Sequence, residues 1–416
     1  MDKLVISGPT KLKGNVEISK AKNALLPLLA ATLLSEEPIT LKNIPSLRDI
    51  NTMHNLLKHL GVEVTQRDRD FTYHCNKLST SEAPYEMVKT MRASICVLGP
   101  LLSRFKKARV SLPGGCAIGT RPIDLHLKNL EKMGAVINIE AGYVEAETTG
   151  LKGARLVLEF PSVGATENLM MAAVLAEGET VIENAALEPE VTDLGNYLIS
   201  MGAKIEGLDS NTIKVLGVPS LKGGEYSAIG DRIEAATYII AGLMTGSEIT
   251  VNGFDPLHLD SVLEKLKQMG AKLEIGDSSV KTLPSKISAS NIDTAPFPGF
   301  PTDVQAQMMA LALVADGASI ITEHIFENRF MHVPELQRMG ADITIKGSSS
   351  FVNGGKPLKG APVMCTDLRA SAALVLAGFC AEGKTTIQRV YHLDRGYEDL
   401  ANKFIKLGAN IERVSE

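Results

Sequence analysis

The pattern of hydrophobic and polar positions repeats six times along the chain. Each repeat contains an apolar helix, a short strand, and then an amphipathic helix that ends in glycine and leads into a β-branched strand. The glycines at these helix ends lie 68 to 73 residues apart: Gly61, Gly134, Gly202, Gly270, Gly340 and Gly408. So regular a period indicates a duplicated structural unit, and its length predicts a small subdomain rather than a solenoid repeat.

The amphipathic helices predict the outer layer of each repeat. In Asp260–Gly270, residues Val262, Leu263, Leu266 and Met269 fall on one helical face. The glycine that follows is expected to adopt the left-handed conformation that ends many helices. A short strand comes next, such as Lys272–Ile275, and a turn-rich hairpin follows it.

A second class of helix is apolar on every side, which predicts that it is buried on every side. Each of these helices precedes a short strand. The pairs are Ala24–Leu34 with Ile39–Ile44, Asn168–Ala176 with Thr180–Asn184, Ala235–Met244 with Glu248–Val251, Gln305–Ala315 with Ser319–Thr322, and Ala370–Ala381 with Thr385–Val390. Each repeat should therefore contain one inner helix, one outer helix and about four strands, an α/β arrangement.

The sixth repeat ends at Glu416 without its hairpin. The phrase Leu-Lys-Gly, which occurs near hairpins at Leu151, Leu221 and Leu358, also occurs at Leu12. We therefore expect residues 1–21 to supply the strands that the last repeat lacks. This predicts two groups of three repeats, 22–229 and 230–416 plus 1–21, and one continuous array of six repeats is the alternative.

Composition adds limits on function. The formal net charge of -5 offers no general attraction to nucleic acid or to an anionic membrane. Five scattered cysteines without metal-binding spacing are typical of reduced thiols in a cytoplasmic protein. The first residues have no signal-peptide pattern, and the apolar runs are too short to span a bilayer.

Polar and charged residues gather in the first turns of the otherwise apolar inner helices. A helix N-terminus attracts anions, so cations at this place are best explained by an anion that they bind. For the acids and hydroxyls, N-capping is an equally good explanation. The residues are Lys22, Asn23, Arg92, Ser162, Thr166, Asp231, Arg232, Thr302, Asp303, Asp367 and Arg369.

The segment from Leu112 to Pro122 places Cys116 among three glycines, which predicts a mobile, exposed loop. A cysteine is poorly placed for packing there, so Cys116 is a candidate reactive thiol, with an incidental surface thiol as the alternative. His126, in the helix that follows, is more often a structural residue.

Several motifs together resemble the UDP-N-acetylglucosamine 1-carboxyvinyltransferase family, over the whole chain. They are Ser19-Lys20-Ala21-Lys22-Asn23-Ala24, Thr90-Met91-Arg92-Ala93-Ser94, Leu112 to Leu125, Ser162-Val163-Gly164-Ala165-Thr166, Phe300-Pro301-Thr302-Asp303, Phe326-Glu327-Asn328-Arg329-Phe330, Thr366-Asp367-Leu368-Arg369-Ala370 and Asp394-Arg395-Gly396-Tyr397-Glu398.

The resemblance implies two inside-out α/β barrel domains, each of three βαβαββ units. It implies transfer of the enolpyruvyl group of phosphoenolpyruvate to the 3′-hydroxyl of UDP-N-acetylglucosamine by addition and elimination, with release of phosphate. This is the first committed step of peptidoglycan synthesis, which supports the cell wall, cell shape and division. The family acts in the cytoplasm on these small molecules, without metal or organic cofactor, nucleic acid or membrane insertion; the sequence leaves the oligomeric state open.

The same resemblance implies roles for individual residues. Cys116 would donate a proton to C3 and would be the point of attack of the epoxide antibiotic fosfomycin. Asp303 would be the general base, with Glu188 as a possible accessory. Phosphoenolpyruvate would be bound by Lys22, Asn23, Arg121, Arg329, Arg369 and Arg395, with Lys22 and Arg395 also catalytic. UDP-N-acetylglucosamine would contact Asn23, Arg92, Arg121, Pro122, Ile123, Asp124, Leu125, Ser162, Val163, Gly164, Asp303 and Ile325.

One departure from the family is Phe160, where many members carry lysine, so a charged contact to the diphosphate is in doubt. Two other functions remain to be weighed. The related transferase that acts on shikimate 3-phosphate lacks the Gly-Gly-Cys loop followed by Arg-Pro-Ile-Asp-Leu. A nucleotide-sugar-binding regulatory protein would not need Cys116, Asp303, Lys22 and Arg395 together.

Overall fold

The computed structural model describes residues 2–89, 91–112 and 123–415. These residues form two compact units. Unit I lies within residues 20–229, and unit II consists of residues 2–19 and 230–415. The described residues form six four-stranded sheets, which agrees with the six repeats and about four strands each that the hydrophobic pattern predicts.

The described residues of unit I form three inner helices and three outer helices. The inner helix α4 packs against α6, and η2 contacts α1, α4 and α6. The inner elements are α1 (Lys22–Ala31), η1 (Thr32–Leu34), η2 (Arg92–Val97), α4 (Leu98–Phe105) and α6 (Val163–Ala173). The outer helices are α2 (Arg48–Leu60), α5 (Asp124–Lys132) and α7 (Pro189–Ser200), with α3 (Tyr85–Val88) between repeats.

The sheets of unit I have one strand order in common. The first is β14 (Gly224–Tyr226), β3 (Ile39–Leu41), β5 (Asp70–His74) and β4 (Glu63–Arg67). The second is β6 (Glu82–Ala83), β7 (Lys107–Ser111), β9 (Tyr143–Glu147) and β8 (Val136–Glu140). The third is β10 (Arg155–Val157), β11 (Glu179–Glu183), β13 (Thr212–Leu216) and β12 (Lys204–Glu206).

Unit II repeats this plan. Its inner helices α8 (Arg232–Met244), α10 (Gln305–Val314) and α12 (Leu368–Cys380) pack against one another. Its outer helices are α9 (Asp260–Gln268), α11 (Val333–Arg338) and α13 (Leu400–Lys406), and its short 3-10 helices are η3 (Pro256–Leu259), η4 (Thr302–Val304) and η5 (Val390–Arg395).

The three sheets of unit II have the same order of strands. Read from the strand that opens the repeat, the first is β2 (Lys13–Glu17), β15 (Glu248–Asn252), β17 (Ser279–Leu283) and β16 (Lys272–Ile275). The second is β18 (Ile292–Asp293), β19 (Ala318–Thr322), β21 (Ser349–Asn353) and β20 (Asp342–Lys346). The third is β22 (Pro362–Met364), β23 (Gly383–Gln388), β1 (Lys3–Gly8) and β24 (Ile411–Val414).

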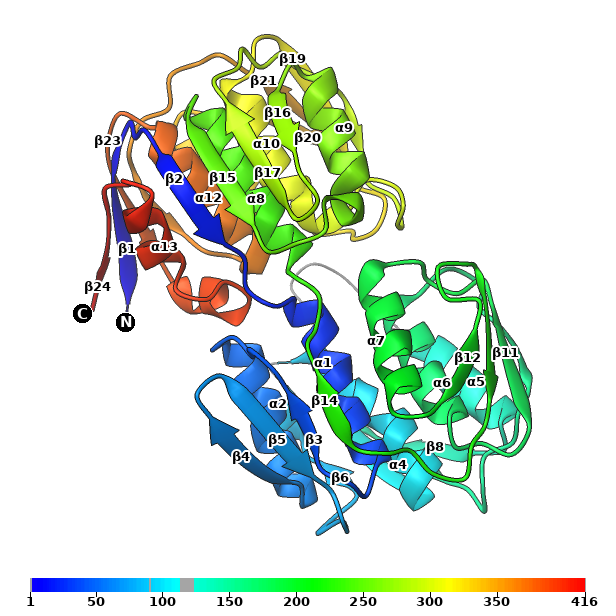
Figure 1. The fold of residues 1–416 in the computed structure, drawn as a ribbon. Helices are drawn as coiled ribbons and strands as arrows, with labels where there is room; N and C mark the ends of the chain where they lie inside the picture. The colour runs from blue at the N-terminus through cyan, green and yellow to red at the C-terminus, as the bar shows by residue number, and fades with distance from the viewer. Residues whose placement is uncertain (1, 90, 113–122, 416) are drawn as a thin grey trace. The chain divides into compact units, whose positions relative to one another are not determined.

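Two terminal strands complete different repeats, which corrects one expectation. β1 pairs antiparallel with β23 and β24, so it completes the last repeat as predicted. β2, however, runs parallel to β15 and opens the fourth repeat (Figure 1). The Leu-Lys-Gly phrase therefore marks the chain as it enters the first strand of a repeat, as it also does before β10, β14 and β22. In the same way, β14 runs parallel to β3 and opens the first repeat.

Burial follows the sequence pattern. Every residue of α8 is buried, whereas α2 is buried along one side only. Each unit has its own hydrophobic core, built from the inner helices and the strand faces that cover them. The six glycines at the ends of the outer helices have positive φ, from 90° to 107°, as predicted. Within the described residues, the sheets of a unit do not join into one closed barrel.

Candidate active site

In unit II, two buried arginines bind one carboxylate. Arg329 donates from Nη2 to Oδ1 of Asp303 over 2.8 Å. Arg369 donates from Nε and Nη2 to Oδ2 of Asp303, over 3.2 and 3.0 Å. The arginine side chains are 4% and 3% exposed, and that of Asp303 is 27% exposed. Charge-assisted bonds of this kind fix the orientation of a carboxylate more firmly than neutral hydrogen bonds do.

The fold brings these residues together because η4 and α12 begin at corresponding places in neighbouring repeats. Asp303 lies in η4, directly before α10, and Arg369 lies in the first turn of α12. Because α10 packs along α12, the two side chains meet. Arg329 comes from the segment that follows β19 in the same repeat as Asp303.

Both arginines of this group are buried cations. Burial lowers the pKa of Arg369, but Asp303 first, and then Tyr397 and Asp231, outweigh burial and raise it. Arg369 therefore stays charged at every ordinary pH. Among the described residues, Arg329 Nε and Arg369 Nη1 are buried without a well-aligned hydrogen-bond partner. Buried donors of this kind suit an anionic ligand, since bidentate guanidinium groups match carboxylates and phosphates.

N-capping accounts for three of the acids and hydroxyls for which it was an alternative: Asp231, Asp367 and Ser162. Asp231 accepts hydrogen bonds from the Ile233 and Glu234 amides. Asp367 accepts them from the Arg369 and Ala370 amides, and Ser162 from the Ala165 amide. Asp303, in contrast, is not at the N-cap position of η4 or of α10, which are Pro301 and Val304, and its carboxylate accepts from the two arginines. The structure therefore separates Asp303 from the capping residues.

Glu323 hydrogen-bonds to residues around Asp303 and Arg329, and the sequence pattern did not indicate a role for it. Its Oε2 accepts from the Thr302 hydroxyl over 2.8 Å, and that hydroxyl also accepts from Arg329 Nη1 over 3.1 Å. Its Oε1 accepts from the amides of Ile325 and Phe326. Glu323 thus ties predicted residue Ile325 to the turn that carries Asp303. A buried acid directly after a strand is the sequence signal that could have found it.

Arg395 ends η5, which packs against α12. Its side chain is partly buried. Tyr397, two residues on, lies under the Arg369 guanidinium, 5.6 Å from ring centroid to Cζ. The Tyr397 hydroxyl is 2.9 Å from Oγ1 of Thr237 in α8, so all three inner helices of unit II contribute to this region.

In unit I, Lys22 begins α1 and is buried, with its Nζ 3.5 Å from Oδ2 of buried Asp49 in α2. Asn23 follows it and is partly buried. An ammonium placed in the first turn of a helix is unfavourable for the helix dipole. Asp49 compensates for this cost, and it was not singled out by the sequence pattern because Asp at a helix start usually serves the helix itself.

Arg92 begins η2 and acts on the buried imidazole of His126 in α5. Burial, and then the charge of Arg92, lower the pKa of His126 to about 4. Its Nδ1 is 3.0 Å from Nδ2 of Asn168, whose Oδ1 accepts from the Gly99 amide. His126 therefore joins α5, α6 and α4 in a hydrogen-bonded core, which is the structural role expected for it.

The remaining predicted nucleotide-sugar residues of unit I lie at the starts of α5 and α6. Ile123 and Leu125 are buried, whereas Asp124 is exposed. Val163 and Gly164 open α6 beyond the Ser162 cap, and all three are partly exposed. Gly164 faces His126, because a Cβ added there would lie 3.5 Å from its ring. These two helix starts are therefore neighbours.

Glu188 stands at the N-cap position of α7, without a side-chain cap bond, and two further acids, Glu167 and Glu190, are near it. Burial, and then the charges of Glu190 and Glu188, raise the pKa of Glu167 well above its usual value. Glu167 was missed by the sequence analysis, although it is the single charged residue within α6.

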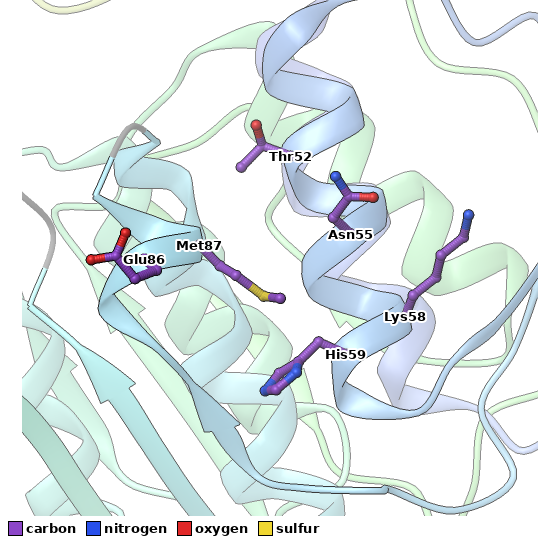
Figure 2. A pocket seen from close by; sticks show the side chains of 6 residues that line it. All are labelled: Thr52, Asn55, Lys58, His59, Glu86 and Met87. Atoms are coloured by element: carbon purple, nitrogen blue, oxygen red, sulfur yellow. The ribbon is translucent and has the colours of Figure 1, made fainter.

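Cys116, Arg121 and Pro122 lie outside the described residues. A surface hollow of about 600 Å³ in unit I is lined by residues of α2 and α3 and by no described residue of the predicted site (Figure 2). Its lining residues are Thr52, Asn55, Lys58, His59, Glu86 and Met87. Among the described residues, no helix is long and apolar enough to cross a membrane.

Comparisons with known proteins agree with this fold. A family model described as EPSP synthase (3-phosphoshikimate 1-carboxyvinyltransferase) matches residues 6–404. The crystal structure of the enolpyruvyl transferase NikO from Streptomyces tendae superposes with a TM-score of 0.90 at 26% identity, covering 100% of this chain and 99% of that chain. EPSP synthase from Acinetobacter baumannii superposes with a TM-score of 0.77 at 18% identity, covering 100% of both chains. The chain is an enolpyruvyl transferase.

Curated relatives narrow this class. UDP-N-acetylglucosamine 1-carboxyvinyltransferases from Koribacter versatilis and Trichlorobacter lovleyi are each 54% identical to the chain, over 100% of its length and 97% and 100% of theirs. The enzyme of this name from Acinetobacter baylyi is also 54% identical, over 100% of both chains. The chain belongs to the UDP-N-acetylglucosamine 1-carboxyvinyltransferase family.

Proposed function

We propose that the protein transfers the enolpyruvyl group of phosphoenolpyruvate to the 3′-hydroxyl of UDP-N-acetylglucosamine and releases phosphate. The observation that carries the proposal is the Asp303 carboxylate between buried Arg329 and Arg369. The reaction needs a carboxylate that can accept a hydroxyl proton and cations that bind a phosphate and a carboxylate. This group has both kinds of side chain, at the starts of α10 and α12 and in the segment that follows β19.

In the first step, the hydroxyl oxygen adds to C2 of phosphoenolpyruvate as Asp303 takes the hydroxyl proton. C3 gains a proton from the Cys116 thiol, which gives a tetrahedral phosphate ketal. In the second step, C3 loses a proton, the C–O bond to phosphate breaks, and the carbon–carbon double bond returns. Asp303 and Cys116 therefore act as base and acid, with Glu188 as a possible accessory.

The cations divide between the two units. Lys22, with Asn23 beside it, lies in unit I, and Arg329, Arg369 and Arg395 lie in unit II. We assign Lys22, Arg121 and Arg395 to the phosphate of phosphoenolpyruvate. Arg329 and Arg369 bind the anionic groups that develop or shift during the reaction. Bidentate guanidinium groups suit both because their planar donors match a phosphate or a carboxylate.

Several polar segments would bind the nucleotide sugar: Arg92, Arg121, Pro122, Ile123, Asp124, Leu125, Ser162, Val163, Gly164, Asp303 and Ile325. In support of this acceptor, relatives named for UDP-N-acetylglucosamine are 54% identical over the full chain, whereas EPSP synthase is 18% identical. The exposed Phe160 lies just before this set and offers no charge to a diphosphate. A cytoplasmic location is part of the proposal, because both substrates are charged metabolites.

The test is phosphate release from phosphoenolpyruvate with each acceptor. We expect release with UDP-N-acetylglucosamine, and a product heavier than it by one enolpyruvyl group. Release with shikimate 3-phosphate instead would indicate the related transferase. Binding of UDP-N-acetylglucosamine without any release would indicate a regulatory protein, and either result would refute the proposal.

A further inference from the structure

One buried histidine lies beside the segments that carry both arginines of the Asp303 group. His332 is 0% exposed and stands at the N-cap position of α11, where its carbonyl accepts from the amides of Glu335 and Leu336. Helix α11 packs against α12 and β22. No activity or binding role was predicted for His332 from the sequence.

The His332 ring is enclosed but poorly satisfied. Among the described residues, neither ring nitrogen has a well-aligned hydrogen-bond partner. Burial removes water from this polar ring and replaces little of that hydration, so a purely structural position would be better filled by an apolar side chain. The presence of a polar ring at this position therefore indicates a role for His332 beyond packing.

The charges that act on this ring belong to Asp367 and Arg329, and the Arg329 backbone also faces it. Asp367 caps α12 by accepting from the Arg369 amide over 2.9 Å. Arg329 reaches Asp303 directly. Arg329 comes shortly before His332 in the chain, and α11 packs against α12, which Asp367 caps. The ring therefore lies near the segments that carry Arg329 and Arg369, the two donors to Asp303.

Burial lowers the pKa of His332 to about 4, with Asp367 acting in the opposite direction and Arg329 in the same direction. The ring is neutral at pH 7, which suits a place near both a cation and a capping carboxylate. A charged imidazolium would repel Arg329 and compete with the α12 amides for Asp367. A neutral imidazole neither repels Arg329 nor draws Asp367 away from the α12 amides.

We propose that His332 is a positioning residue that holds the Arg329 segment and the Asp367 cap of α12 so that both arginines stay on Asp303. The proposal rests on the proposed function for its effect on turnover. The predicted effect of His332 on the positions of the two arginines does not depend on which reaction the protein catalyses. Because His332 acts through other residues, it touches no substrate and takes no proton in the reaction.

The test compares His332→Phe, His332→Asn and His332→Gln. We expect His332→Phe to lower kcat about tenfold or more, because loss of alignment near reacting atoms weakens catalysis, while the KM for UDP-N-acetylglucosamine changes less than about threefold. The acidic limb of the kcat profile should move to higher pH, since a carboxylate that loses a cation ionises less easily. Asn or Gln, neutral and polar, should restore part of kcat.

A matched control is His54→Phe in unit I. His54 is also buried, its pKa is also lowered to about 4 by burial and then by Lys58, and its Nε2 is 2.7 Å from the Tyr73 hydroxyl. We expect this variant to lose thermal stability and to keep the kcat profile. If His332→Phe also loses only stability, and keeps both the kcat profile and slow exchange of the Arg369 Nε–H, His332 is only a packing residue and the proposal is wrong.

A second readout needs no turnover. The Arg369 Nε–H donates to Asp303, so its NMR signal should exchange slowly with solvent in the parent protein. His332→Phe should accelerate this exchange, and His54→Phe should not. An unchanged Arg369 signal would overturn the positioning role. Faster exchange together with unchanged kcat would uphold the positioning role and instead refute Asp303 as the base.

Discussion

Arg369 donates two hydrogen bonds, from Nε and Nη2, to the same carboxylate oxygen, Oδ2 of Asp303. The two residues are 66 positions apart, close to one repeat length. Each lies where the inner helix of its repeat begins. The contact is thus a consequence of duplication: equivalent ends of neighbouring inner helices meet, and side chains there can combine into one site. A carboxylate fixed in this way can be aimed at a bound hydroxyl group.

Asp303→Asn should lower kcat strongly and change the affinity for UDP-N-acetylglucosamine by less than about tenfold, roughly 1.4 kcal/mol. An amide cannot take the hydroxyl proton, yet it keeps the shape of the side chain. The measurement is steady-state kinetics with calorimetric binding. The control is Asp293→Asn in the same unit, an exposed acid that we expect to be silent. Near-normal turnover of Asp303→Asn would remove the base assignment.

Arg369→Lys should not preserve activity, although it preserves charge. Lysine cannot present the Nε and Nη2 pair to one oxygen, and Arg369 is buried. We expect kcat/KM for phosphoenolpyruvate to fall about 100-fold, or roughly 2.7 kcal/mol. Arg155→Lys, at an exposed arginine that binds Glu183 with two donors, should change neither activity nor stability measurably. Equal behaviour of the two lysine variants would contradict this account.

The repeats, the inner and outer helices and the left-handed glycines followed from sequence because they depend on local pattern and period. The place of β2 did not, because Leu12-Lys13-Gly14 is compatible with either end of a strand and only pairing decides between them. For the site, the sequence indicated Asp303 and Arg369 but left capping open for the former. Their contact depends on two helices from different repeats, which no local signal encodes.

The supporting residues were the least predictable. Asp49 beside Lys22 and Glu323 behind Thr302 are buried acids whose partners come from other elements. His332 comes just after the motif from Phe326 to Phe330, but its place at the start of a helix gives no sequence signal of a special role. Such residues are chosen by tertiary contacts and burial, so a hydrophobic pattern carries little information about them.

Asp193 should make the free energy of unfolding of unit I depend on pH. Burial raises its pKa from 3.8 to about 6, against the Tyr226 hydroxyl and the Ile229 amide, which lower it. Since the folded pKa is above the unfolded one, this contribution to stability is present below about pH 4 and is lost as pH rises through 6. Tyr226 Oη lies 2.8 Å from Asp193 Oδ1, and this hydrogen bond offsets part of the effect of burial.

The measurement is urea unfolding of the parent and of Asp193→Asn from pH 4 to 7. Asparagine does not titrate, so the free energy of unfolding of the parent relative to the variant should fall by up to about 3 kcal/mol as pH rises over this range. Asp209→Asn, at an exposed acid of the same unit, serves as control. A parent-to-variant difference that is constant with pH would contradict the raised pKa.

Fosfomycin should modify Cys116 and no other cysteine. Burial raises the pKa of the four described cysteines, Cys75, Cys96, Cys365 and Cys380, and for the last two the pKa is about 12. A thiol with so high a pKa is almost never a thiolate at neutral pH, and the thiolate is the nucleophile that opens an epoxide. Peptide mass mapping after inactivation should therefore find the adduct on Cys116 alone, and an adduct on any other cysteine would contradict this selectivity.

Two variants at Cys116 separate its acid role from its role as a nucleophile. Cys116→Asp should stay active and resist the epoxide, because a carboxylic acid donates a proton but attacks an epoxide poorly. Cys116→Ser should resist the epoxide and turn over at least about 100-fold more slowly, since a hydroxyl is too weak an acid near neutral pH. Cys380→Ser, at the least buried of the four described cysteines, should leave both turnover and inactivation unchanged. Full activity of Cys116→Ser would show that another group protonates C3.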